Sequence, residues 1–338
     1  MEKLLLPLSK DLMHELDVHE DSIKVAPFQG EMCTVFNAHS GIHGALVIKT
    51  ALKDMKLSEE GQREIRQNKE GYGCIPNSFR PEILASDRED TFLIMPNVGK
   101  PLRDLLWENR CFPETCANVV EEFLGNLSRL FKDTKTHDVE AKNIFLDQLQ
   151  NMGHFFLQGD FFPNQLRDKF ILLVNHIRQS DDNTVAFATL DLTQGNLLVD
   201  IVKLPQTLRV IDPKSPRLVR GEPTFLGIPE VDLGMFLTTL SLNAPNVVQS
   251  LNIENRLRNI GQDLRSDAHM SDFSFKLGKL FGCVLVASFP NTVERVETYL
   301  KSLSVNYDDD TRDSVIRERE RHVQMAMEIA NSMELIQL

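Results

Sequence analysis

One stretch of the sequence and the apolar run that follows it carry carboxylate and amide side chains at a spacing that could serve catalysis. Asp191 and Asn196 lie five positions apart in the segment TLDLTQGNLLV, residues 189–199, which ends in a β-like run. A second β-like run, LRVI at 208–211, leads directly to Asp212. The sequence therefore sets two carboxylates and one amide beside short strands.

Phosphoryl transfer needs a carboxylate that orients, and can deprotonate, an attacking hydroxyl group. It also needs oxygen ligands that hold Mg²⁺ against the phosphates, because Mg²⁺ prefers oxygen and binds few protein groups. Asp191 suits the first role, and Asn196 and Asp212 suit the second. Each motif alone is common, since an Asp after a strand often forms a turn or caps a helix. The two motifs together, in this order, favour phosphoryl transfer.

The first hundred residues have the pattern of about five strands with one inserted helix. Apolar and β-branched runs separated by turn residues predict strands at 22–26, 33–38, 45–48, 83–85 and 91–95. The charged segment 57–70 predicts a helix, because Ser58 can cap its start and acidic residues at 59–60 complement the N-terminal dipole. A further helix is expected at 5–16.

After Met95 the pattern changes to helices. Apolar residues three and four positions apart predict helices at 101–107, 113–132, 141–152, 164–177, 231–242, 273–287, 293–302 and 313–335. Short strands are expected only at 197–199 and 208–211. The chain is therefore predicted to be an α+β protein with two lobes, a small antiparallel-sheet lobe at 1–97 and a larger helical lobe at 98–338.

At these motifs the sequence resembles the aminoglycoside phosphotransferase and choline kinase group of the protein-kinase-like fold. The segment TLDLTQGN (189–196) resembles that family's H-x-D-x-x-x-x-N catalytic loop, and IDP (211–213) resembles its metal-binding segment. The segment GIPEVDL (227–233) is similar to the family's G-D-P-x-x-D-L stretch. This likeness implies that Asp232 caps a helix and steadies the catalytic loop rather than reacting. The resemblance extends over about residues 20–240.

The resemblance also implies nucleotide-binding residues in the first lobe. Lys49 ends the third expected strand, as the family's nucleotide lysine does, and its ammonium group would reach the α- and β-phosphates. A glutamate of the following helix should pair with it. Glu64 and Glu70 are both in that helix, and Glu64 is preferred because its distances in sequence from Lys49 and Met95 are more like those of the family.

The segment FLIMPNV, residues 92–98, resembles the hinge that binds adenine. If Met95 is the gatekeeper, Pro96 need offer only its backbone C=O to the adenine amino group, which a proline retains although it lacks an N–H. Val98 can offer both an N–H and a C=O. The hinge is therefore chemically compatible with ATP.

Three departures from the family pattern bear on activity. Thr189 replaces the histidine of the catalytic loop, which removes a side chain that orients the loop but does not react. The nucleotide loop at 27–32 contains one glycine and no G-x-G-x-x-G pattern. Pro213 follows the metal-binding Asp212, so no D-F-G sequence is present, which disfavours a conventional protein kinase.

Composition limits the class of protein. The 338 residues carry a net charge of −12, which disfavours nucleic acid as the main partner because phosphate backbones require clustered Lys and Arg. The five cysteines are scattered, which favours reduced thiols over a zinc site. No apolar run approaches the ~20 residues that span a bilayer. A cytoplasmic protein without integral membrane association is expected.

The leading hypothesis is a phosphotransferase that uses ATP and Mg²⁺ to phosphorylate a hydroxyl group of a small molecule, such as an aminoglycoside, choline or a sugar. The resemblance implies that residues 1–97 bind the nucleotide and that 98–338 hold the catalytic loop and the acceptor. Two alternatives stay open: an atypical protein kinase with a protein acceptor, and a pseudokinase that binds nucleotide or a protein partner without turnover. An acidic pocket would favour a cationic acceptor, and its candidate carboxylates are Glu222, Glu230 and Asp263.

Overall fold

The computed structural model describes residues 8–26, 33–53, 56–97, 99–108, 117–158, 162–192, 196–199, 208–213, 215–288 and 309–333. The chain divides into two compact units. The first unit contains Met1–Lys100 and Leu198–Pro216, and the second contains Pro101–Leu197 and Arg217–Leu338. The expected nucleotide loop at 27–32 and the expected helix at 293–302 lie outside the described residues.

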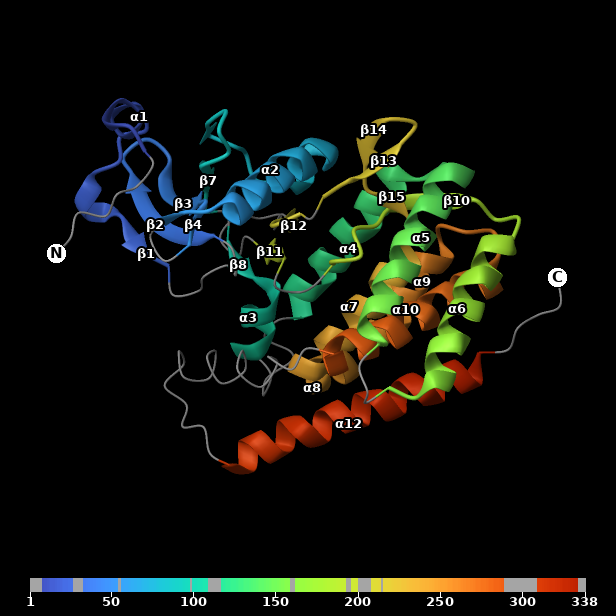
Figure 1. Cartoon of the computed structure of the whole chain (residues 1–338). Coiled ribbons are helices and arrows are strands. Elements are labelled where there is room, and N and C mark those ends of the chain that lie inside the picture. The colour runs from blue at the N-terminus through green and yellow to red at the C-terminus, as the bar shows by residue number, and fades with distance from the viewer. Residues whose placement is uncertain are drawn as a thin grey trace. The chain divides into compact units, whose positions relative to one another are not determined.

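The first unit is built on a five-stranded antiparallel sheet with the strand order β1-β2-β3-β7-β6 (Figure 1). Its strands are β1 Lys24–Val25, β2 Thr34–Ser40, β3 Gly44–Thr50, β6 Ala85–Ser86 and β7 Phe92–Pro96. The unit also contains the short elements α1 Lys10–Glu15, η1 Glu20–Ser22, β4 Leu52–Lys53, β5 Lys56–Leu57, η2 Asn77–Phe79 and β12 Leu208–Val210. Strands β12, β11 (Leu197–Val199) and β8 (Lys100–Pro101) form a separate three-stranded sheet.

Alternation along β3 separates a core face from a polar face. Leu46 and Ile48 are buried in a cluster with Phe36 of β2 and Ile94 of β7. Because successive side chains of a strand point to opposite faces, Lys49 lies on the face opposite to this cluster. The strand pattern thus directs the expected nucleotide lysine toward helix α2, where it contacts Glu64 and Asn68.

Helix α2, Glu59–Cys74, packs against β3 and β7 (Figure 1). Its start is fixed by Ser58, whose Oγ accepts the Gly61 N–H at 3.0 Å, as an N-cap serine does. A Cβ added to Gly61 would lie 2.8 Å from the backbone of Ala51. Glycine at this position therefore allows the first turn of α2 to approach the end of the sheet closely.

The second unit is mainly helical. Its helices are α3 Leu102–Glu108, α4 Ala117–Thr134, α5 Val139–Phe156, α6 Asn164–Gln179, α7 Pro229–Asn243, α8 Pro245–Ser250, α9 Ile253–Gln262, α10 Ala268–Ser288 and α12 Asp309–Ser332. Helix α12 packs along α10 and also contacts α6 (Figure 1). Among the described residues, no helix combines the length and the apolar character that a membrane crossing requires.

Helices α7 and α10 pack closely against each other. A Cβ on Gly234 of α7 would lie 2.2 Å from the Phe275 carbonyl oxygen, and one on Gly278 of α10 would lie 2.1 Å from the Val231 carbonyl oxygen. Glycine on both sides thus brings the two backbones together. This packing fixes the first turn of α7, which carries Asp232.

Several short strands complete the second unit. They are β9 Thr136–His137, β10 Thr184–Phe187, β13 Arg217–Val219, β14 Glu222–Thr224 and β15 Leu226–Gly227. Strand β10 lies between β15 and β9 in a three-stranded antiparallel sheet. All four residues of β10 are buried, so it carries no polar alternation to distinguish it from a loop or helix segment.

The predicted fold class is confirmed: a small antiparallel sheet with one packed helix, and a larger helical region. The prediction was incomplete: it lacked helices α8 and α9 and the two-residue strands β4, β5 and β8, and it differed in two further respects. It contained no strand at β9, β10, β13, β14 or β15, which have two to four residues each. It also ended the third strand at Lys49, whereas β3 continues to Thr50.

Candidate active site

Lys49 is the centre of a polar cluster in the first unit. Its ammonium group contacts Glu64 Oε1 at 2.6 Å, Asn68 Oδ1 at 2.8 Å and Asp212 Oδ1 at 2.5 Å. Glu64 and Asn68 belong to α2, and Asp212 lies 163 residues from Lys49 in sequence. An ammonium group has three N–H donors, so three acceptors match its capacity.

The two carboxylates stabilise the charge of Lys49. Burial alone would lower its pKa, but Asp212 and Glu64 outweigh burial and raise the pKa above its usual value. The lysine side chain is only 10% exposed, whereas that of Asp212 is 39% exposed. Lys49 therefore stays charged at all physiological pH values, and the Asp212 carboxylate is the accessible member of the pair.

Asp212 follows β12 in an unusual backbone conformation. Its φ is +50°, in the left-handed region that few residues other than glycine adopt, although Asp tolerates it. Its N–H donates to the Tyr72 hydroxyl at 3.2 Å. Strained backbone conformations are often retained at functional positions, which makes this segment a candidate for function on structural grounds.

The loop with Asp191 and Asn196 belongs to the second unit except for its last residues. Asn196 Nδ2 donates to the Asp191 carbonyl at 3.2 Å and to Asp191 Oδ2 at 3.0 Å. Asp191 is flanked by Leu190 and Leu192, which are both buried. Leu190 has a φ of +58°, which is rare for a leucine. The loop is thus anchored on both sides of a half-buried aspartate.

Asp232 holds this loop from the first turn of α7. Its carboxylate accepts the N–H of Thr189 at 2.6 Å and that of Leu190 at 2.9 Å. Ile228 occupies the N-cap position of the helix. The family resemblance implies that Asp232 caps the helix and steadies the catalytic loop. The structure shows the contact with the loop, but the N-cap of α7 is Ile228 rather than Asp232.

Thr189 makes contacts that the sequence interpretation did not anticipate. Its hydroxyl group donates to Asp232 Oδ2 at 3.3 Å and accepts the N–H of Asp191 at 3.1 Å. Thr189 was expected only to remove an orienting histidine. It instead connects Asp232 to Asp191, so the loop retains a polar support at this position.

Arg217 is a second support that no sequence motif indicated. It is 6% exposed, donates through Nη2 to the Ala188 carbonyl, and packs over the Phe145 ring at 5.0 Å. Its Nη1 donates to Gln148 Oε1 at 2.8 Å. A buried arginine next to the loop start was not detectable from spacing, because Arg217 lies 26 residues from Asp191 and in no recognised pattern.

The expected hinge residues Met95 and Pro96 form the end of β7. Met95 pairs with Val47 and Pro96 pairs with Leu46 of β3, and Met95 is buried. Val98, the third expected adenine contact, lies outside the described residues. The roles of Met95, Pro96 and Val98 toward adenine stay predictions.

The donor chemistry of Asn196 and Asp212 fits Mg²⁺, which prefers oxygen ligands. Asn196 directs its amide nitrogen to Asp191, so its amide oxygen is the atom that could bind a metal ion. No group of three or more His, Cys, Asp or Glu side chains among the described residues could hold a metal ion. A few protein oxygens combined with nucleotide phosphates are the usual arrangement for this ion.

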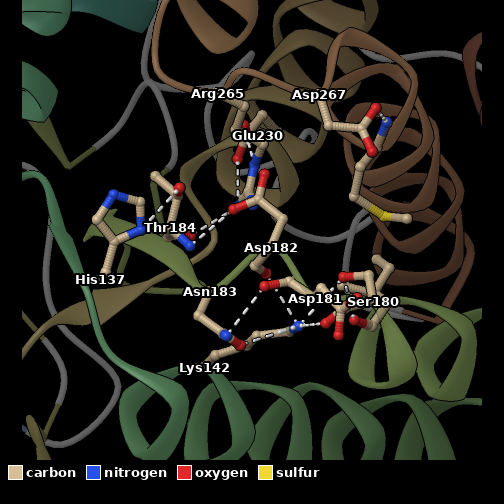
Figure 2. Close-up of polar contacts among 12 residues, drawn as sticks. His137, Lys142, Ser180, Asp181, Asp182, Asn183, Thr184, Glu230, Arg265 and Asp267 are labelled. Carbon is tan, nitrogen blue, oxygen red and sulfur yellow. Dashed lines mark hydrogen bonds and ion pairs between the residues drawn. The ribbon is translucent and has the colours of Figure 1, made fainter.

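The candidate acceptor carboxylates differ in accessibility. Figure 2 shows Glu230 in a buried cluster, where its Oε1 lies 2.6 Å from Arg265 Nε. Arg265 also contacts Asp182 at 3.2 Å. Because Glu230 is fully buried, it cannot contact an acceptor, and that candidate is wrong. Asp263 is exposed and lies 3.6 Å from Lys132, and Glu222 is an exposed residue of β14.

Lys142 lies beside this cluster and is also structural. Figure 2 shows its ammonium group among backbone and side-chain oxygens, including the Ser180 carbonyl at 2.7 Å and the Asp182 carbonyl at 2.9 Å. Burial lowers the pKa of Lys142 to about 8, and the Arg265 guanidinium acts in the same direction. The cluster joins α5, α7 and the turn at 180–183.

Comparison with known proteins gives matches in structure but not in sequence. No family model and no curated protein matches this chain. The structure is similar to that of a choline kinase from Cryptosporidium parvum Iowa II, with 12% identity, a TM-score of 0.49, and coverage of 93% of this chain and 91% of that one. It is also similar to a macrolide 2'-phosphotransferase from Brachybacterium faecium, with 13% identity, a TM-score of 0.45, and coverage of 96% and 97%.

Proposed function

We propose that this chain is an ATP- and Mg²⁺-dependent phosphotransferase that transfers the γ-phosphoryl group to a hydroxyl group of a small molecule. The observation that carries this proposal is the contact of the Lys49 ammonium with both Glu64 and Asp212. A buried lysine that is paired with a helix glutamate and lies next to a half-exposed aspartate provides a cation for phosphates and an oxygen ligand for Mg²⁺.

Each residue has a separate role in this proposal. Lys49 binds the phosphates, and Glu64 keeps Lys49 in place. Asn196 and Asp212 would hold Mg²⁺, which neutralises charge on the phosphates when bound. Asp191 accepts a hydrogen bond from the acceptor hydroxyl, orients it and takes its proton. Catalysis of this type depends on positioning and electrostatics.

The proposed adenine contacts and acceptor site are those that the family resemblance implies. The backbone of Met95, Pro96 and Val98 would bind adenine. The acceptor would bind to the helical region, for which the chemistry of the described side chains specifies no single compound. A hydroxyl group is the proposed acceptor, because the Asp191 carboxylate can orient a hydroxyl group and take its proton.

The proposal is tested by calorimetric titration of ATP with Mg²⁺ into the wild type and Asp212→Ala, with slow ATP hydrolysis followed in the same samples. We expect metal-dependent binding in the wild type and its loss in Asp212→Ala. Asp191→Ala should bind nucleotide as the wild type does but lose hydrolysis by about 10²- to 10⁴-fold, the range for removal of a general base.

Each other result has a defined meaning. Metal-dependent binding without turnover in the wild type would favour a pseudokinase. Transfer of labelled phosphate to protein rather than to water or a small hydroxyl compound would favour a protein kinase. Absence of nucleotide binding by the wild type would contradict the proposal.

A further inference from the structure

Helix α2 carries a polar stripe that extends beyond the glutamate already assigned. Glu64, Asn68 and Tyr72 are spaced four positions apart, so they lie on one face of the helix. Asn68 is 3% exposed and Tyr72 is 1% exposed. Polar groups are seldom buried without partners, and the side-chain polar atoms of this stripe meet Lys49 and the segment 212–213.

Asn68 contacts both Lys49 and the segment 212–213. Its Oδ1 accepts from the Lys49 ammonium at 2.8 Å, and its Nδ2 donates to the Pro213 carbonyl at 3.0 Å. Chemistry requires this orientation of the amide, because an ammonium group can only donate and a carbonyl can only accept. A single side chain thus connects a residue of β3 to a backbone group more than 140 residues away.

Tyr72 fixes the other side of the same segment. Its hydroxyl oxygen accepts the Asp212 N–H at 3.2 Å. Burial raises the pKa of Tyr72, so the hydroxyl stays protonated. The two contacts, on the N–H of Asp212 and on the C=O of Pro213, enclose the peptide unit that joins these residues. Asp212 adopts its left-handed conformation between them.

We infer that Asn68 and Tyr72 are positioning residues, which set the place of the Asp212 carboxylate relative to Lys49. This inference rests on the proposed function of Lys49 and Asp212. Asn68 and Tyr72 act through Lys49 and Asp212 rather than on the reacting atoms. Helix α2 therefore does more than supply Glu64: through three side chains on one face it holds the nucleotide lysine and the metal-binding segment in one arrangement.

The test uses the full chain and three variants. Asn68→Leu removes the bridging amide, and Tyr72→Phe removes only one hydroxyl group. Gln62→Leu is the matched control, because Gln62 also ties α2 to a loop, through a hydrogen bond of 2.8 Å to the Glu89 carbonyl, but on another side of the helix. Binding of a non-hydrolysable ATP analogue is titrated at increasing Mg²⁺ concentration.

The Mg²⁺ concentration for half-maximal binding should rise about 10-fold in Asn68→Leu and Tyr72→Phe, the lower end of the effect of groups that orient metal ligands. Gln62→Leu should not change it. Affinity for the analogue at saturating Mg²⁺ should change much less for Tyr72→Phe than for Asn68→Leu, since only Asn68 touches Lys49. An equal loss in all three variants would mean a general structural effect and would overturn the inference.

A second measurement does not need nucleotide. The rate of acylation of Lys49 by acetic anhydride is followed by mass spectrometry, with the exposed Lys24 as reference. Asn68→Leu removes one of the three acceptors that hold the ammonium group, which should make Lys49 less restrained and raise its relative rate several-fold. An unchanged rate together with an unchanged Mg²⁺ dependence would overturn the inference. A wild type that does not bind the analogue, with Lys49 still activated in Asn68→Leu, would contradict the proposed function but not the role of Asn68.

Discussion

At the scale of single residues, the expected catalytic loop depends on the buried carboxylate of Asp232. This side chain is fully buried and accepts hydrogen bonds from the backbone of Thr189 and Leu190. A buried charge is retained at a cost unless hydrogen bonds compensate it. Its ionisation should therefore be coupled to the stability of the fold.

Burial raises the pKa of Asp232 to about 6, although the Thr189 and Leu190 hydrogen bonds and the charge of Arg217 oppose the rise. The folded protein thus holds the carboxyl proton of Asp232 more tightly than the unfolded chain does. The resulting contribution to stability is complete below the ordinary aspartate pKa of 3.8 and is lost as the pH rises through about 6.

We expect the stability advantage of the wild type over Asp232→Asn to decrease as the pH rises from about 4 to about 7, because only the wild type titrates at this position. Urea unfolding of both proteins across this range measures the difference in unfolding free energy. Asp263→Asn, at an exposed carboxylate, serves as control and should stay within about 0.5 kcal/mol of the wild type. An advantage that grows with pH would show that the hydrogen bonds, not burial, dominate.

At the scale of elements, helix α2 positions the first unit's polar cluster, and its first turn depends on Gly61. The Gly61 position lies against the backbone of Ala51, which cannot move aside as a side-chain end can. Gly61→Ala should therefore push α2 away from the sheet. Overpacking of this kind typically lowers the unfolding free energy by about 1–3 kcal/mol.

Gly73→Ala is the matched control for this prediction, since a Cβ there meets nothing within 4 Å in the same helix. It should be neutral or stabilising by up to about 1 kcal/mol, the difference in helix propensity. Chemical denaturation compares the two variants, and the nucleotide titration shows whether Gly61→Ala also weakens Mg²⁺-dependent binding. Equal stability of the two variants would contradict a close approach at Gly61.

The elements that could be predicted from sequence are those that local patterns specify. An apolar run after turn residues identified β3, and Ser58 with the following acidic residues identified the start of α2, because both signals lie within a few residues. Strand β10 was missed, since four buried residues without alternation give no period. The hydroxyl bridge of Thr189 and the guanidinium of Arg217 were missed because their partners are set by tertiary packing, not by spacing.

At the scale of the whole molecule, the two compact units do not follow the order of the sequence. Residues 198–216 belong to the first unit although both flanking segments belong to the second. Local patterns cannot predict this, because contacts such as those of Lys49 with Asp212 join residues 163 positions apart. Only the family resemblance grouped Lys49 and Asp212, because it implies that Lys49 binds the phosphates and that Asp212 binds the metal ion.

This organisation predicts how the first unit behaves in isolation. A fragment of residues 1–100 lacks Asp212 and Pro213, so the buried polar groups of Lys49, Asn68 and Tyr72 lose partners. Each unsatisfied buried polar group costs about 1–3 kcal/mol, which is a large share of a small domain's stability. The fragment should therefore not unfold cooperatively.

A single chain in which a flexible Gly/Ser linker joins residues 1–100 to residues 198–216 should recover a cooperative transition, measured by circular dichroism in urea. The same joined chain with Asp212→Ala and Tyr72→Phe is the control, and it should be less stable because it restores β12 and the contact of Asn68 with Pro213 but not the contacts of Asp212 with Lys49 and Tyr72. A fragment 1–100 that unfolds as cooperatively as the joined chain would contradict the argument. The contacts of Asp212 and Pro213 would then serve the site alone, and the first unit would owe its stability to the sheet and α2.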